Sequence, residues 1–337
     1  MLNNNYSQIL RNLFFNIAYQ TGTSKLFRWI LSKNNDLVIL TFHRVSDDID
    51  QMWPPMPISS FRSLMEKLVQ EFRIIDINDL TRLPANSGSP YMVVTFDDGY
   101  SDFVENAVPI LLDLGIPACH SVCPSLIDRR RPPWTQILSV CLNSFEQKYL
   151  KLPDGTNFKI SEPVNEKMFL ALCDRLYAVD DEVRSLWVDN LAETLKVTFD
   201  LYSMMTWDDI RSCIRNGFSI GSHSYSHRNL SKVMELELLD TEISFSRQRI
   251  LDETGVAPSV FSFPSGLYSD NSLKVVKKSG YSIALLCDEM PANISMINNS
   301  NELLCLPRIN IGRTNWKEEV FRSSAFHYRI NRITNRN

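Results

Sequence analysis

Apolar residues follow two alternating patterns along most of the chain. Continuous runs of apolar and β-branched residues, typical of strands buried on both faces, cover residues 37–45, 91–100, 118–122, 218–222, 260–263 and 282–286. Between these runs, apolar residues recur every three or four positions, as in amphipathic helices, over residues 59–71, 104–114, 207–216 and 236–254. Strands that alternate with helices in this way predict an α/β fold with a largely parallel sheet or barrel.

The N-terminal segment predicts helices that lie outside this alternation. Five apolar residues share a helical spacing there: Ile9, Leu10, Leu13, Phe14 and Ile17. A second, short helix is expected over residues 25–31. Such helices can pack on the domain or lie on a membrane surface. We expect packing, because the polar face is not rich in Lys and Arg; peripheral contact with a membrane or a biosynthetic complex is the alternative.

The alternation of strands and helices stops between residues 125 and 205. A turn at residues 129–134 is followed by helical patterns over residues 167–178 and 181–195. We interpret this segment as a helical insertion that could shape a substrate groove, and no residue in it can be given a role. The predicted organisation is N-terminal helices in residues 1–35, one domain over residues 36–320 with the insertion at about 125–205, and a tail over residues 321–337. We expect the Arg/Asn-rich part of the tail after Ala325 to be frayed.

Composition and charge narrow the class of protein. The 337 residues are 44% hydrophobic and 22% charged, as in a soluble globular protein with a sizeable core. The net charge of −4 creates no basic field, so we expect no nucleic-acid partner. Seven cysteines without paired spacing indicate reduced thiols. The sequence shows neither a clean signal peptide nor a membrane span, and a cytoplasmic location follows as an expectation.

Polar, ionisable residues follow three of the predicted strands. The first strand ends in Thr-Phe-His at residues 41–43, the second in Thr-Phe-Asp-Asp-Gly at residues 95–99, and the third in Gly-Ser-His-Ser-Tyr-Ser-His at residues 221–227. In α/β sheets and barrels, reactive groups gather where parallel strands end at their carboxyl edge. We therefore expect these three segments to meet in one site.

The residue types in these segments suit a metal centre. His223 and His227 have a spacing common among divalent-metal ligands, although two surface histidines can share that spacing by chance. Asp97 and Asp98 are costly to bury without compensation, and a nearby cation would favour their ionised forms. Neighbouring strand residues point to opposite sides, so one carboxylate could be a ligand and the other a base. The alternative is a pair that caps the following helix.

The two motifs also resemble those of a known family. TFDDGY and the downstream GSHSYSH are similar to the first two motifs of the polysaccharide deacetylase family, also called the NodB-homology or carbohydrate esterase 4 family. LVILTFHRV, PSLIDRRRPPW, MTWDDIRSCIRNGFSIGSHSYSH and FSFPSG follow the order of the branch linked to bacterial exopolysaccharide and capsule biosynthesis. The resemblance spans residues 37–312. It implies an irregular (β/α)7-type barrel and hydrolysis of N-acetyl groups on a glycan or glycan precursor, with release of acetate.

The resemblance also implies roles for particular residues. Asp97 would be the general base. Asp98, His223 and His227 would hold a divalent metal, zinc in the first place, with Co²⁺ or another divalent ion as the alternative. The third motif of the family corresponds here to residues 264–266, so the backbone N–H of Ser265 is the candidate donor to the oxyanion.

The sequence departs from the common family pattern in two places. Ser262 stands where an arginine usually braces the catalytic aspartate, and Arg308 is our hypothesis for its replacement, with a surface ion pair as the alternative. No histidine lies between His227 and His327 to serve as the general acid. In the branch resembling poly-N-acetylglucosamine deacetylases the acid histidine follows the first strand, which makes His43 the candidate. The alternative for His43 is a hydrogen-bonded core histidine.

We expect the two remaining histidines to have no catalytic role. His120 lies on the predicted strand at residues 118–122 and is expected to be structural, and His327 is expected to be solvated. Two other functions stay open. One is a deformylase or deacetylase of a lipid-linked or nucleotide sugar, which a cytoplasmic location at the periphery of the inner membrane would favour. The other is a catalytically inactive glycan-binding protein.

Overall fold

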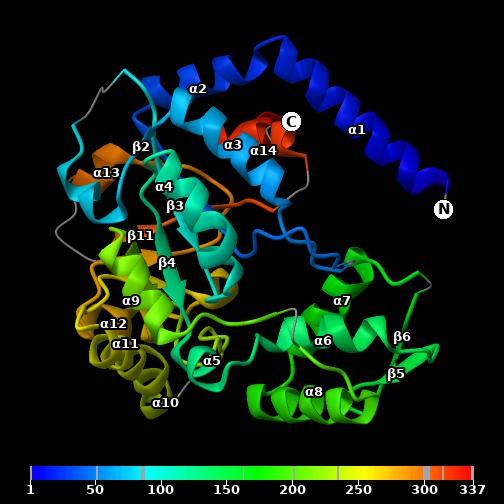
Figure 1. Cartoon of the computed structure of the whole chain (residues 1–337). Coiled ribbons are helices and arrows are strands. Elements are labelled where there is room, and N and C mark those ends of the chain that lie inside the picture. Colours follow the sequence, from blue (N-terminus) through cyan, green and yellow to red (C-terminus); the bar gives the residue numbers. More distant parts are fainter. Residues whose placement is uncertain are drawn as a thin grey trace.

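The centre of the computed structural model is a curled, mostly parallel β-sheet surrounded by helices (Figure 1). The structure describes residues 2–50, 52–84, 88–161, 163–199, 202–233, 235–298, 304–312 and 315–334. The strands of the main sheet are β1 (Asp36–Phe42), β2 (Arg73–Ile74), β3 (Tyr91–Phe96), β4 (Cys119–Val122), β7 (Ser219–Ser222), β8 (Val260–Ser262), β9 (Ile283–Leu285), β10 (Ala292–Asn293), β11 (Leu304–Leu306) and β12 (Ile309–Asn310). This confirms the predicted α/β fold.

The sheet closes almost completely into a barrel. Parallel pairs run in the order β1-β3-β4-β7-β8-β9-β11. Directly after β11, at one end of this order, the chain enters β12, which pairs in parallel with β1 at the other end. The barrel is therefore of the (β/α)7 type, as expected, and its last position is shared by two very short strands.

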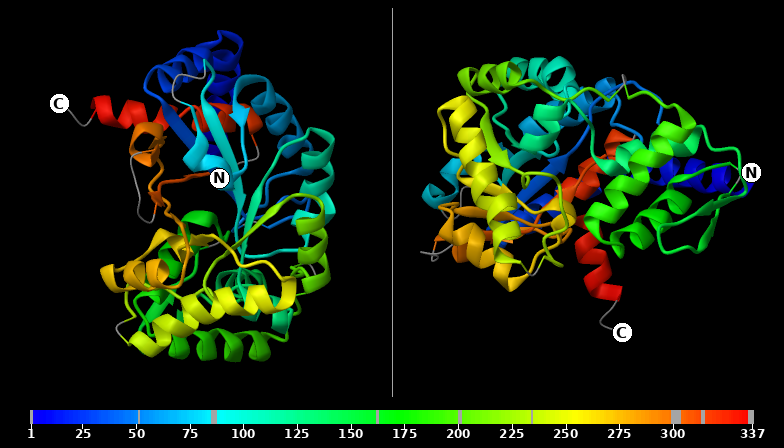
Figure 2. Two further views of the ribbon diagram at one scale, coloured as in Figure 1. Left: turned by 90° about the vertical axis from the view of Figure 1, so that its left-hand side faces the viewer. Right: turned by 90° about the horizontal axis from the view of Figure 1, so that it is seen from below.

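Helices pack around the outside of the barrel (Figure 2). The α-helices of the α/β core are α3 (Ile58–Glu71), α4 (Val108–Asp113), α5 (Pro124–Arg129), α9 (Trp207–Arg215), α10 (Leu236–Asp240), α11 (Ser246–Thr254), α12 (Asp270–Lys278), α13 (Ile294–Asn298) and α14 (Trp316–Ser323). The core also contains the 3-10 helices η1 (Ile77–Arg82) and η4 (Pro264–Gly266) and the π-helices η2 (Phe103–Ala107) and η3 (Thr241–Phe245). The helix predicted over residues 236–254 is thus divided by a π-helical turn, η3, whereas the one predicted over residues 104–114 begins with a π-helical turn, η2, and continues as α4.

The two faces of each central strand have different neighbours. All residues of β1 and β3 are buried, as expected of strands covered on both sides. Val38 and Leu40 belong to the apolar cluster beneath the outer helices, whereas Leu37 and Ile39 belong to a separate cluster. Thr41 pairs in register with Thr95 and continues the second face towards the carboxyl ends of the strands. Polar side chains therefore begin where that apolar cluster stops.

The predicted insertion forms a small unit with its own core. It contains α6 (Trp134–Asn143), the hairpin of β5 (Tyr149–Lys151) and β6 (Asn157–Lys159), α7 (Glu166–Tyr177) and α8 (Asp181–Leu195). Leu138, Leu172 and Val188 from its three helices are completely buried in one cluster. The green segment in Figure 1 shows the unit beside the lower end of the barrel. Helix α6 and the hairpin were not predicted from the sequence pattern.

The N-terminal helices pack on the domain, but not through the face that we expected. Helix α1 (Leu2–Gln20) and helix α2 (Thr23–Lys33) run along one edge of the molecule (Figure 1). The described members of the predicted apolar face are all exposed: Leu10, Leu13, Phe14 and Ile17. The side chain of Ile9 lies outside the described part. The expectation was wrong because α1 contacts α14 through a different face, which is polar and aromatic: Arg11 binds Glu318, and Asn12 accepts a hydrogen bond from Asn315.

The C-terminal segment is helical rather than frayed. Residues 326–334 form α15 (Phe326–Thr334), and residues 335–337 lie outside the described part. Phe326 packs edge-on against Phe27 of α2, and Arg329 donates to Asp36 at the start of β1. These contacts order a segment that its composition alone assigned to solvent. Among the helices that the structure describes, none is long and apolar enough to cross a membrane.

Candidate metal and catalytic site

The two central motifs meet at the carboxyl ends of β3 and β7. The Nε2 atom of His223 lies 3.5 Å from Oδ1 of Asp98, and Nε2 of His227 lies 3.3 Å from the same oxygen. One ligand atom from each of these three residues falls within 4.8 Å of the other two. The residues predicted from two separate motifs therefore lie together in one cluster, in which two imidazoles face a single carboxylate oxygen.

Both imidazoles are in the form that binds metals. Burial lowers the pKa of His223 and of His227 to about 4, although the charge of the Asp97 carboxylate acts to raise both values. Both rings are therefore neutral at pH 7. Nδ1 of His223 lies 2.8 Å from the carbonyl oxygen of Ser262. Because a carbonyl only accepts, Nδ1 must carry the proton, and Nε2 is left with its lone pair facing Asp98.

The backbone of the site is turned into left-handed conformations that non-glycine residues rarely adopt. Asp98 has φ 76°, His227 φ 60° and Ser265 φ 56°. Asp98 lies two residues beyond the end of β3, so its side chain does not follow the strand alternation that we expected to separate it from Asp97. Oδ2 of Asp97 is 3.9 Å from Nε2 of His223, on the same side as Asp98. The two carboxylates therefore share one site and differ in their partners instead.

The cluster has the donor set and an unsatisfied oxygen that a divalent cation would use. Oδ1 of Asp98, which both Nε2 atoms face, is buried and has no hydrogen-bond partner. Burial raises the pKa of Asp98, with the charge of His43 acting in the opposite direction, so the ionised carboxylate needs a cation nearby. Two imidazole nitrogens and one carboxylate oxygen form a three-residue set of the kind found in catalytic zinc sites. The residues fit a zinc-like ion.

Asp97 is held by an arginine from a distant part of the chain. Arg308 is completely buried, and its NH1 and NH2 groups donate to the two oxygens of Asp97 at 2.9 and 2.7 Å. The guanidinium also donates to the hydroxyl of Thr41 at 3.0 Å and to the carbonyl of Leu286 at 3.1 Å. Burial alone would raise the pKa of Asp97, but Arg308 and then His223 outweigh it and hold that pKa well below its usual range.

This pair decides between the two interpretations of Arg308. The segment between β11 and β12 carries Arg308 into the barrel end, where it reaches Asp97 across 211 residues of sequence. The alternative of a surface ion pair is wrong, because neither side chain is more than 2% exposed. Ser262, in the position of the usual family arginine, instead presents its carbonyl to His223.

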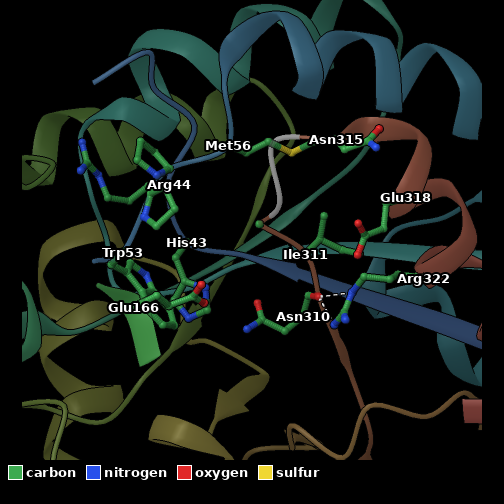
Figure 3. Close-up of a pocket in the computed structure, with 13 residues that line it drawn as sticks. His43, Arg44, Trp53, Met56, Glu166, Asn310, Ile311, Asn315, Glu318 and Arg322 are labelled. Atoms are coloured by element: carbon green, nitrogen blue, oxygen red, sulfur yellow. Dashed lines mark hydrogen bonds between the residues drawn. The ribbon is translucent and has the colours of Figure 1, made fainter. Parts of the chain in front are cut away.

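His43 lines a cavity of about 280 Å³ (Figure 3). Its charge is among those that affect the pKa of Asp98 and of His227, so it is near the candidate ligands. It is partly exposed, and its ring lies edge-on to Trp53 with centroids 6.1 Å apart. None of the other proposed site residues lines this cavity. His43 is therefore not a fully buried core histidine, and it joins the buried cluster to open space.

The cavity wall combines an aromatic ring with charged and amide groups. Residues 43–56 form one side, and the segment after β12 together with α14 forms the other (Figure 3). Arg322 in this second wall donates to the carbonyl of Asn310 at 2.7 Å. Glu166, from the first turn of α7, reaches the cavity from the insertion. Such a lining suits a polar ligand with hydroxyl groups.

Ser265, in η4 directly after β8, is tied to the insertion. Its hydroxyl is 2.8 Å from the hydroxyl of Tyr177 at the end of α7. Burial raises the pKa of Tyr177, and the nearby Asp98 charge affects it in the same direction, so the phenol stays protonated. Sequence reasoning missed Tyr177, because a lone aromatic residue in a helical pattern carries no signal of its own.

The insertion also contacts the loop that carries the metal ligands. Asp181 at the start of α8 forms ion pairs with Arg184 of the same helix and with Arg228, which directly follows His227. The guanidinium of Arg184 lies 4.5 Å from the centre of the Trp134 ring. Glu242 of η3 supports the same loop from the barrel side by accepting from the backbone and side chain of Ser226. The insertion is thus part of the site's framework.

The two histidines expected to lack a catalytic role have different environments. His120 on β4 is completely buried, and its Nε2 lies 3.2 Å from the carbonyl oxygen of Asp97. It thus supports the backbone at the site, in agreement with a structural role. His327 is partly buried and packs edge-on against Phe15 and Phe326, so the expectation that it is solvated was wrong.

Comparisons with known proteins show the family to which the chain belongs. A family model described as polysaccharide deacetylase matches residues 85–284, more than half of the chain. The chain therefore belongs to the polysaccharide deacetylase family and is a hydrolase of the deacetylase class. The comparison with curated protein sequences found no match.

Solved structures share the fold at low sequence identity. The Streptococcus pyogenes deacetylase PplD, in complex with acetate, has a TM-score of 0.57 and 16% identity, over 86% of this chain and 98% of that one. IcaB from Ammonifex degensii has a TM-score of 0.56 and 14% identity, over 86% and 97%. A polysaccharide deacetylase from Bacillus cereus has a TM-score of 0.53 and 16% identity, over 86% and 69%. At these identities, the likeness shows the fold.

Proposed function

We propose that this protein is a metal-dependent N-deacetylase that releases acetate from N-acetylated amino sugars of a polysaccharide or its precursor. The observation that carries the proposal is the convergence of two neutral imidazoles on Asp98, beside a second carboxylate that Arg308 keeps ionised. Family membership supports the deacetylase class. The metal, the catalytic roles and the substrate are our inference from the chemistry of the residues.

Asp98, His223 and His227 would hold the metal. A divalent cation, zinc in the first place and Co²⁺ as an alternative, would supply Lewis-acid activation of the amide carbonyl and of the attacking water. Ser262 keeps His223 in the tautomer that leaves Nε2 available. The chain's own contribution here is to present three ligand atoms from two strand ends with little exposure to water.

Asp97 is the proposed general base. Its carboxylate lies beside the cluster and is ionised at neutral pH, so it can accept a proton from the attacking water. Arg308 fixes its orientation through two hydrogen bonds and also lowers its proton affinity. A carboxylate of low proton affinity gives the proton up again readily, which suits a group that must be ionised before each turnover.

His43 and Ser265 complete the proposed chemistry. His43 borders both the cluster and the cavity, where it can donate a proton to the leaving amine nitrogen of the sugar. The backbone N–H of Ser265 is the proposed donor to the developing oxyanion. The hydrogen bond between Ser265 and Tyr177 supports that role because it ties the left-handed turn to the insertion.

The amino sugar that is deacetylated can belong to a polymer or to a biosynthetic precursor. The seven cysteines are free thiols, which suits a reducing compartment, and on this ground we place the protein in the cytoplasm. A lipid-linked or nucleotide sugar is then the alternative substrate to a finished exopolysaccharide. A catalytically inactive glycan-binding protein is disfavoured, because the arginine missing from the third motif is replaced in space by Arg308.

The test is acetate release from N-acetylglucosamine oligomers by the purified protein, before and after chelation, with zinc or cobalt added back. We expect release that returns with the metal and disappears in Asp97→Asn and His43→Ala proteins. Bound metal without release from oligomers would move the search to lipid-linked and nucleotide sugars. A protein that binds no metal and releases no acetate from any of these substrates would overturn the proposal.

A further inference from the structure

The outer face of the two N-terminal helices carries a group of large apolar side chains. Each is between 52% and 63% exposed: Leu10, Leu13, Phe14 and Ile17 of α1, and Leu26 and Trp29 of α2. We call these six residues the apolar stripe. Isolated exposed apolar residues are common on proteins, but a contiguous set at helical spacing marks an interaction surface.

The inner face of the same helices holds them against the domain. Phe15 packs on Phe321 with ring centroids 5.5 Å apart, and Tyr19 lies edge-on to Trp316 at 5.3 Å. In α2, Arg28 forms a buried ion pair with Glu71 of α3. The helices are thus fixed by one face, and the apolar stripe points away from the barrel. A rearrangement that buried the stripe against the domain would have to break these contacts.

The charges of the helices identify the kind of partner. Residues 1–35 contain no Asp and no Glu, whereas they contain four Lys and Arg residues. The two arginines point inward, to Glu318 and Glu71. Lys25 and Lys33 are exposed, and the ammonium group of Lys33 lies 5.9 Å from the centre of the Trp29 ring. An apolar stripe flanked by lysines and free of carboxylates complements an anionic lipid surface.

We propose that α1 and α2 bind the surface of membranes that contain anionic lipids, with the apolar stripe at the level of the headgroups. Leu and Phe side chains would enter the apolar side of the interface, and Trp29 has the amphipathic ring that is enriched at this depth. A second copy of the chain fits this face less well. In a twofold dimer the same surface meets itself, which would bring lysines together without a carboxylate from residues 1–35 to pair with them.

Membrane binding through α1 would also place the proposed substrate cavity close to the lipid. Arg11 and Asn12, on the inner face of α1, contact Glu318 and Asn315, and both of these residues line the cavity beside His43. The cavity therefore lies about one helix diameter, roughly 10 Å, from the lipid-facing side. This extension rests on the proposed function and suits an amino sugar attached to a lipid carrier. The binding proposal itself does not depend on it.

The experiment is flotation of the full-length protein with vesicles of phosphatidylcholine, with and without phosphatidylglycerol, at low and high salt. We expect binding to the anionic vesicles that weakens at high salt. A Leu13→Ser/Phe14→Ser protein should bind about a hundredfold more weakly. Reversal of the two exposed charges, in a Lys25→Glu/Lys33→Glu protein, should weaken binding to anionic vesicles by at least about tenfold, because each lysine contributes about fivefold near an anionic surface.

Matched controls come from exposed residues elsewhere. Leu186 of α8 and Leu236 of α10 are as exposed as the stripe, and Leu186→Ser/Leu236→Ser should bind vesicles like the parent protein. Lys274→Glu/Lys278→Glu on α12 is the charge control. Circular dichroism and acetate release from soluble oligomers verify folding. Because flotation is independent of deacetylation, a protein that floats but releases no acetate would count against the proposed function alone.

Three results would overturn the membrane proposal. The first is no flotation with either kind of vesicle. The second is equal binding by the parent protein and by Leu13→Ser/Phe14→Ser. The third is a parent protein that is dimeric and does not float, with the stripe substitutions making it monomeric, since this would assign the face to a second copy of the chain.

Discussion

Replacement of Arg308 by alanine should destabilise the protein and almost abolish deacetylation. Arg308 and Asp97 are both buried and share two short hydrogen bonds, so the substitution leaves a carboxylate in the barrel without its cation. Removal of one partner of a buried pair costs about 3–5 kcal/mol. Loss of a correctly held base should reduce kcat by at least about a hundredfold. Arg308→Lys keeps the charge but not the paired donors, and should recover part of the stability and little of the activity.

The pH dependence of this effect distinguishes the ion pair from a simple packing defect. In the parent protein the pKa of Asp97 is lower when folded than when unfolded, so the pair contributes stability that is present above the ordinary Asp pKa of 3.8 and is lost as the pH falls through the folded value. Without Arg308, burial raises the folded pKa instead. The stability difference between the two proteins should therefore be largest near neutral pH and shrink as the pH falls through the raised pKa that Asp97 has in the variant, which lies above 3.8.

Urea unfolding of the metal-free proteins at pH 7 and at lower pH measures these differences, and acetate release measures activity. Arg249→Ala is the control, because Arg249 and Asp128 form a similar two-bond pair in which both side chains are more than a quarter exposed. That substitution should cost at most about 1 kcal/mol. Asp97→Asn in the Arg308→Ala background should restore stability without activity, since no buried charge remains. Parent-like stability and activity of Arg308→Ala at pH 7 would refute the reasoning.

Four further outcomes are expected. His223→Ala should lose stoichiometric zinc after dialysis, measured by elemental analysis, and full retention would contradict its role as a ligand. His43→Asn should keep the metal while kcat falls by about 10²–10⁴-fold, and an unchanged kcat would assign the proton donation to another group. Tyr177→Phe, which removes the bond to Ser265, should lower kcat by about tenfold with little change in KM; a change in KM alone would indicate a role in substrate binding. Burial lowers the pKa of His120 from 6.5 to about 4, so its contribution to stability is complete above about pH 6.5 and decreases towards pH 4, by at most about 3 kcal/mol, which His120→Gln should remove from the pH profile of urea unfolding.

Much of the candidate site could be predicted because local sequence carries its chemistry. Asp97 and Asp98 directly follow an apolar strand, and His223 and His227 directly follow another, so the rule that reactive groups gather at the carboxyl ends of parallel strands brings them together. The strand pattern also predicted an α/β fold with a parallel sheet or barrel, and the family resemblance implied the (β/α)7-type barrel. It missed the strands β11 and β12, because runs of three and two residues around Pro307 are too short to show a period.

The face of α1 shows where a reliable pattern leads to a wrong conclusion. The spacing of Leu10, Leu13, Phe14 and Ile17 correctly predicts an amphipathic helix, but it does not say what covers the apolar face. In the structure, the partners of α1 are the polar and aromatic side chains of α14, and the tail helix α15 adds Phe326 against α2. These partners are about 300 residues away in sequence, so no local pattern could identify them.

The sequence by itself therefore predicted the elements that have a period, the α/β class and, with the family resemblance, the residues that can act as acid, base or ligand. Only the tertiary structure decided the contacts between distant segments that hold these residues in place. Arg308 reaches Asp97 across 211 residues, and Tyr177 reaches Ser265 across 88. Periodicity reflects how a segment buries its own face, and neighbouring residues are enough to reveal it. A contact between distant residues depends on the packing of every element between them, and that information exists only in the folded chain.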